Sequence, residues 1–130
     1  MTSITRTNKS YSKSAQSYII ALSDTSSDIA TGTNIESFRF DFECELSCVF
    51  IEVDSAQPPT GGDIICDVNF EGATIFIEKP KILATESKSQ NIDFFSKKIF
   101  QQGDEITFDV DQVGSGDTGK RLKIHLIINL

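Results

Sequence analysis

The amino-acid sequence predicts an all-β fold: an antiparallel β-sandwich, jelly-roll-like, with about eight strands and an extended N-terminal arm. Short runs of alternating apolar and polar residues recur along the chain, most clearly at 104–113 and 122–130. Such alternation has the period of a strand with one buried face. Clusters of Gly, Pro, Ser and Asn separate the runs at the spacing of sandwich strands. No run has the length and period of an ordinary helix.

The composition indicates one domain with its own core. A chain of 130 residues, 38% of them hydrophobic, is long enough to bury a core without disulfides or metals. A formal net charge of −7 argues against binding nucleic acid through its phosphates. The sequence has no run of 18 apolar residues and no apolar leader. We therefore expect no membrane span and no secretory signal.

Residues 1–16 are expected to form a flexible arm ahead of a sandwich domain at 17–130. They are mostly Ser, Thr, Lys, Asn and Gln, a composition that buries too little surface to offset chain entropy. No acidic residue precedes Asp24. One interpretation is a frayed terminus; the other is an arm that docks on a neighbouring subunit. The residues that would bind such a partner are Ile4, Arg6, Lys9, Tyr11 and Lys13.

The first two strands are expected at 17–22 and 37–42. The first is a short apolar run followed by a polar turn at 23–28. In the second, every other residue is aromatic, which predicts an aromatic inner face. The residues of that face are Phe38, Phe40 and Phe42.

The next run, 46–54, changes the parity of its apolar residues. Leu46 and Cys48 fall on one face, whereas Val49, Ile51 and Val53 fall on the other. A parity change inside one run predicts a β-bulge or a strand that crosses between sheets.

A loop and a tight hairpin follow. Residues 55–62 hold a Pro pair and a Gly pair, which are incompatible with continued ladder pairing. The runs 64–70 and 74–77 flank Glu71-Gly72, a two-residue turn in which Gly72 supplies a positive φ. Short strands are expected at 82–83 and within 92–100.

The last third holds the two clearest strands, 104–113 and 122–130. The glycine-rich segment Gly114–Gly119 joins them, so we expect an antiparallel pair closed by a hairpin loop. This segment also fits G-x-G-x-x-G, and with Lys120 it nearly fits a P-loop. Both motifs need a following helix whose amides bind phosphate. A strand follows here, and Arg121 stands where a P-loop has Ser or Thr, so nucleotide binding is not expected.

Acidic residues offer the other possible chemistry. Paired carboxylates can hydrolyse glycosides, and several together can hold calcium. Asp109 and Asp111 occupy the polar positions of an alternating strand, so we expect them on a solvated face. The full set of such acids is Asp67, Asp104, Glu105, Asp109 and Asp111.

The cysteines and the single histidine predict neither a disulfide framework nor a catalytic triad. Cys44 and Cys48 lie four residues apart in a strand, roughly 13 Å between Cα atoms, beyond disulfide reach. With Cys66 and His125 they nominally make a Cys₃His zinc set. Their spacing does not match known zinc motifs, and buried thiols are the simpler interpretation. We expect no cofactor and no metal.

Several segments together resemble a small β-sandwich domain of tailed-phage virion proteins, found in tail-fibre-like chains and in head-surface proteins. The shared pattern is a Pro-Thr-Gly loop, a hairpin of the form Asp-Val/Ile-Asn-x-Asn-Gly, then Asp-x-Asp-Gln-Val-Gly and a final strand. The resemblance covers about residues 18–128. This chain departs from it at Glu71, where the family usually has Asn, and in its cysteine content. The segments that carry the resemblance are 21–24, 29–33, 38–40, 63–75, 104–114 and 122–124.

The resemblance implies a structural protein of the virion, made in the host cytoplasm and not an enzyme. Because the domain is almost the whole chain, it implies a capsid decoration (cement) protein on the head surface. The expected partners are the major capsid protein or other virion subunits, and symmetric assembly, with a trimer expected, is usual for such subunits. Two alternatives stay open: a tail-fibre or receptor-binding component that recognises host glycans, and a carbohydrate-binding module. Exposed Trp or Tyr would favour the latter, but Trp is absent and both Tyr lie near the N-terminus.

Overall fold

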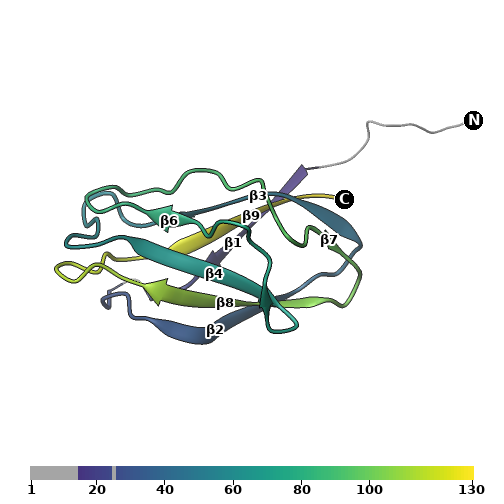
Figure 1. Cartoon of the computed structure of the whole chain (residues 1–130), viewed down its shortest axis with the longest axis horizontal. Coiled ribbons are helices and arrows are strands. Elements are labelled where there is room, and N and C mark those ends of the chain that lie inside the picture. Colours follow the sequence, from purple (N-terminus) through teal and green to yellow (C-terminus); the bar gives the residue numbers. More distant parts are fainter. Residues whose placement is uncertain (1–14, 25) are drawn as a thin grey trace, which may run out of the picture.

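The computed structural model describes residues 15–24 and 26–130, and these residues form two antiparallel β-sheets packed face to face (Figure 1). The strands are β1 (Ala15–Ala21), β2 (Gly32–Arg39), β3 (Cys44–Glu52), β4 (Ile64–Phe70), β5 (Ala73–Thr74), β6 (Lys81–Ile82), β7 (Ile99–Phe100), β8 (Glu105–Gln112) and β9 (Lys123–Asn129). The predicted all-β sandwich is confirmed.

The strand order is that of a jelly roll. One sheet has the order β1-β9-β3-β7, and the other has the order β2-β8-β4-β5, with β6 pairing to β4. In the described part of the chain the two sheets hold nine strands, and with the two short strands β5 and β6 counted together they make the two Greek keys of an eight-stranded jelly roll. From β1 to β4 the chain alternates between the two sheets. β4, β5 and β6 then lie in the same sheet, where β4 and β5 form a local hairpin, and the alternation resumes from β7 to β9.

The predicted hairpin between the last two long strands is wrong. β8 pairs with β2 and β4, whereas β9 pairs with β1 and β3, so these consecutive strands lie in different sheets. The segment 113–122 crosses from one sheet to the other. Alternation shows only that each strand has one buried face. Two strands meet that requirement equally well whether they are neighbours in one sheet or lie in two sheets that face each other.

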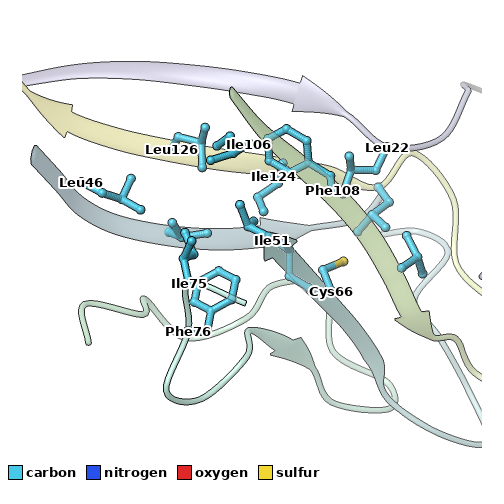
Figure 2. Close-up of a cluster of buried hydrophobic side chains, with 14 of the residues drawn as sticks. Leu22, Leu46, Ile51, Cys66, Ile75, Phe76, Ile106, Phe108, Ile124 and Leu126 are labelled. Carbon is cyan, nitrogen blue, oxygen red and sulfur yellow. The ribbon is translucent and has the colours of Figure 1, made fainter. Parts of the chain in front are cut away.

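The core lies between the sheets and is apolar. Figure 2 shows Leu46 and Ile51 of β3 and Ile124 of β9 gathered with Phe108 of β8 and Cys66 of β4. Aromatic rings fill the end of the core where Phe40 stacks on Phe100 at 4.5 Å between ring centroids. Burial of these side chains is the main force that holds the sheets together.

The parity change in β3 is a bulge, as predicted. Leu46 pairs with Ile128 and Cys48 pairs with Ile127, so one residue of β3 is left over at Ser47. The extra residue turns Leu46 and Val49 both into the core.

The aromatic face of the second strand is shorter than expected. β2 ends at Arg39; Phe40 is buried and Phe38 half-buried, but the Phe42 side chain is 59% exposed. Alternation no longer sets the direction of a side chain once the strand has ended, because the backbone turns at 40–43.

The β4–β5 hairpin turns at Glu71-Gly72. Both residues have positive φ, 51° for Glu71 and 82° for Gly72, which is the requirement of a type I′ turn. Gly72 adopts this conformation without cost, whereas Glu71 carries a side chain that disfavours it. Asn tolerates this conformation better than Glu.

The first strand begins two residues earlier than expected. Ala15 pairs with Asn129, so Ala15 and Gln16 belong to the sheet. The rest of the predicted arm, including all of its predicted partner-binding residues, lies outside the described residues.

Candidate functional site

Three aspartates meet on the outer face of the five-stranded sheet. Asp67 of β4 and Asp109 of β8 are directly paired across the ladder, and Asp111 lies two residues further along β8. One carboxylate oxygen from each aspartate lies within 4.8 Å of the chosen oxygens of the other two. Asp67 is only 6% exposed and Asp109 only 9%, and like charges opposite each other on one face destabilise a strand pair. We call this group the aspartate cluster.

A bulge in β8 brings the third aspartate into the cluster. Ile65 pairs with Gln112 while Cys66 pairs with Val110, which leaves Asp111 without a ladder partner on β4. The kink of a bulge redirects the side chain of the extra residue. Sequence alternation predicts Asp109 and Asp111 on the same face of β8, but it does not predict the register that sets Asp67 against Asp109.

Neutral hydrogen-bond donors hold the two buried carboxylates. The Asn34 backbone N–H and the Asn69 side-chain amide each donate to Asp109, at 2.8 Å from Oδ1 and Oδ2 respectively. The Val68 N–H donates to Asp67 Oδ1 at 2.9 Å, and the Thr74 hydroxyl donates to the same oxygen. Asn34 reaches Asp109 because β2 is irregular between Gly32 and Glu36.

Lys79 supplies a positive charge to the cluster. Its Nζ lies 2.8 Å from Asp111 Oδ2 and 3.3 Å from Asp67 Oδ2. The hydrogen bond to Asp111, followed by the charge of Asp67, raises the pKa of Lys79 above its ordinary value. The ammonium group of Lys79 thus occupies the position that a metal cation bound by these carboxylate oxygens would take.

The expectation that these acidic side chains lie on a solvated face is therefore wrong for two of them. Asp67 and Asp109 are buried and hydrogen-bonded, whereas Asp111 and Glu105 are exposed. Tertiary pairing, which the pattern of a single strand does not contain, brings Asp67 and Asp109 together. An oxygen-rich group of this kind is suited to hold a cation, and here that cation is a lysine side chain.

A polar groove lies beside the cluster on the same sheet face. It has a volume of about 670 Å³ and shares Asp109 and Asn69 with the aspartate cluster. Among the described residues that line it, four are acidic and none is Lys or Arg; Arg39 approaches its rim, 3.5 Å from Glu105. Its acids are Glu71, Asp104, Glu105 and Asp109. We call it the acidic groove.

The glycine-rich loop docks against another loop instead of forming a phosphate cradle. Thr60 accepts a hydrogen bond from the Gly116 N–H at 2.9 Å, and its hydroxyl accepts one from the Asp117 N–H at 2.7 Å. A phosphate bound by this loop would need these two amide N–H groups as hydrogen-bond donors. A Cβ on Gly114 would lie 2.5 Å from the Thr60 carbonyl oxygen. The close packing of Gly114 against the Pro-Thr-Gly loop explains why this position holds a residue without a side chain.

The nominal zinc set is not brought together. Cys44 and Cys66 are buried thiols in opposite sheets, and Cys48 is half-buried. His125 lies on the outer face of β9, where its Nε2 is 2.6 Å from Glu52 Oε2 and its ring stacks on Phe50. Burial raises the pKa of the Cys66 thiol.

Two neighbouring apolar side chains are largely exposed. Phe76 pairs with Phe95 in an isolated antiparallel bridge, and their rings lie 5.9 Å apart. Ile77 follows Phe76 in the chain and is 70% exposed, and Phe94 precedes Phe95 and is 73% exposed. We call Ile77 and Phe94 the apolar pair; the sequence shows no periodicity that would have identified it.

Within residues 15–24 and 26–130, no helix is both long and apolar enough to cross a bilayer. Comparisons of the chain with protein-family models, with curated proteins and with solved structures find no match.

Proposed function

We propose that this chain is a structural protein of a phage particle, a decoration protein that binds the head surface and performs no reaction. The observation that carries the proposal is the apolar pair. Contiguous exposed apolar surface marks protein–protein contact sites, and the apolar pair lies on two segments joined by the Phe76–Phe95 bridge. Ile77 and Phe94 are the two most exposed large apolar side chains among the described residues.

The fold is compatible with this role. Jelly rolls with this architecture are common among viral capsid domains and also among lectins. A shared fold does not establish a function. The choice between a capsid role and a sugar-binding role therefore rests on which side chains the protein exposes. Among the described residues that line the acidic groove, Phe70 is the single aromatic one, whereas sugar-binding sites usually stack the ligand on aromatic rings. We therefore favour decoration over glycan recognition.

The role of a decoration protein is mechanical. A bound copy stabilises the particle because it adds contacts that the disassembled subunits lack. Each copy needs a specific contact of roughly 1,000 Å² or more, with apolar side chains near the centre. The apolar pair would form that centre, and the polar residues around it would form the rim.

The composition of purified particles tests the proposal. Phage particles from the source culture would be purified and the chain quantified by mass spectrometry against the major capsid protein. Decoration predicts hundreds of copies per particle, and immunogold labelling on the head. A few dozen copies with label at the tail tip would support the receptor-binding alternative. Absence from all particles would contradict a virion role.

A second experiment tests the contact site. Heads assembled without the chain would be mixed with the purified protein and sedimented. Ile77→Ser with Phe94→Ser should abolish co-sedimentation. Ile19→Ser removes a side chain that is 59% exposed on β1, in the four-stranded sheet, and this variant should bind as the unmodified protein does. Equal binding by the double variant would exclude the apolar pair as the contact.

A further inference from the structure

The acidic groove has the charge and shape of a site for an extended basic segment. It runs over the outer face of β2, β8 and β4, and its walls offer carboxylates, the Asn34 and Asn69 side chains and the Thr107 hydroxyl. The four carboxylates, including Glu105, which forms an ion pair with Arg39 at 3.5 Å, leave the groove with a net negative charge that attracts cationic groups and repels acidic ones. The groove therefore selects a partner by its charge.

Residues 1–14 of this chain carry the complementary charge. They contain Arg6, Lys9 and Lys13 and no acidic residue, whereas residues 15–130 contain nine basic and all 19 acidic residues. The N-terminal segment thus has a charge of +3, and the remainder has a charge of 9 − 19 = −10. The segment also carries Ile4 and Tyr11 as apolar side chains between its charges.

The segment joins the sandwich at the end where the groove opens. Ala15 pairs with Asn129, Asn129 pairs with Glu45, and the neighbouring Cys44 pairs with Phe100. From Phe100 the chain turns through Gly103, which lines the groove, into β8. Figure 1 accordingly places the N-terminal end of β1 and the start of β8 toward the same end of the molecule.

We propose that residues 1–14 of one copy occupy the acidic groove of a second copy. Fully extended, 14 residues span about 45 Å, enough to cross a neighbouring sandwich. The groove and the segment are different surfaces, which makes the contact heterologous. Such contacts give a ring where the rotation between copies closes and an open filament where it does not. This inference does not depend on a virion role.

Self-association of the purified chain tests the proposal. Sedimentation equilibrium would be measured at about 0.01 M salt, where charges act over about 30 Å, and at about 0.15 M, where they act over about 8 Å. The chain should form oligomers whose dissociation constant rises about tenfold or more between these conditions. A chain that stays monomeric at both salt concentrations would overturn the proposal. This holds also if the chain is monomeric because residues 1–14 occupy the groove of their own copy.

Two charge variants locate the contact. The arm variant carries Arg6→Gln, Lys9→Gln and Lys13→Gln, and the groove variant carries Glu71→Asn and Glu105→Gln. Each should be monomeric under conditions where the unmodified chain associates. The control carries Glu43→Gln and Glu86→Gln, two exposed acids away from the groove, and should associate normally. If the control loses association as fully as the groove variant, net charge and not the groove is responsible.

Mixing the two variants makes the test decisive. The groove variant retains an intact arm, and the arm variant retains an intact groove, so the mixture should restore one productive contact and form a heterodimer. A mixture that stays monomeric, while the unmodified chain associates, would overturn the assignment of the arm to this groove.

Discussion

Asp67 and Asp109 face each other as a directly paired couple across the β4–β8 ladder, and both side chains are buried. Two like charges in this position would separate the strands unless other groups compensated them. Asn34 and Asn69 donate to Asp109, while Val68, Thr74 and Lys79 contact Asp67. Lys79 is the only cation among these partners.

Replacing Lys79 should destabilise the fold. Lys79→Met leaves Asp67 and Asp111 without their counter-charge, and an unpaired buried charge costs about 1–2 kcal/mol after allowance for the 40% exposure of the lysine. Lys81→Met is the control, because Lys81 is exposed on the adjacent strand β6. Urea denaturation should give a lower free energy of unfolding for Lys79→Met only. Equal values for both variants would mean that the ion pairs contribute nothing.

The contribution of Lys79 should disappear at alkaline pH. Its pKa is raised in the folded protein above the ordinary value of 10.5, so the stabilisation is fully present below the unfolded-state pKa and is lost as pH rises through the folded-state pKa. The difference in unfolding free energy between the unmodified protein and Lys79→Met should be constant from pH 7 to 9 and shrink above about 10.5. A difference that grows with pH would contradict this assignment.

Removing the lysine should create a cation site. Lys79→Ser leaves oxygens of three aspartates within 4.8 Å of one another and without an ammonium group, which suits Ca²⁺. Calcium should therefore raise the melting temperature of Lys79→Ser, because a ligand that binds only the folded state stabilises it. The unmodified protein and the double variant Lys79→Ser/Asp111→Asn should show a smaller shift or none.

Adding one methyl group to the glycine loop should be costly. In Gly114→Ala the new Cβ would lie 2.4 Å from the Asp117 carbonyl oxygen and 2.5 Å from that of Thr60. Both neighbours are backbone, so relief requires the two loops to separate, at about 2–4 kcal/mol. Gly72→Asn is the control, since its Cβ meets nothing within 4 Å and Asn tolerates positive φ. Thermal unfolding should show a large loss for Gly114→Ala and a small one for Gly72→Asn.

The three thiols should react at different rates. Burial raises the pKa of Cys66, and Cys66 is fully buried, so little thiolate is available to a thiol reagent. In native protein at pH 8, Cys48 should react first and Cys66 only on the timescale of unfolding. All three should react promptly in guanidinium. Rapid labelling of Cys66 in native protein would show that β4 opens locally.

The sequence by itself determined the local features of the protein. Alternation located β8 and β9, although it placed the second strand at 37–42 instead of 32–39. The parity change between Leu46 and Val49 predicted the β3 bulge as one of two alternatives, and Glu71-Gly72 identified the hairpin turn. Each of these signals comes from residues that are close in sequence, because side-chain direction and turn geometry are set by neighbouring dihedral angles.

Only the tertiary structure decided which strands became neighbours. β8 and β9 are consecutive and equally amphipathic, yet they lie in opposite sheets. The pairing of Asp67 with Asp109, the approach of Lys79 and the acidic groove all follow from that arrangement. The physical reason is that burial specifies which face of a strand turns inward but not which strand lies beside it. That choice is made when the whole core closes, through contacts between residues far apart in sequence.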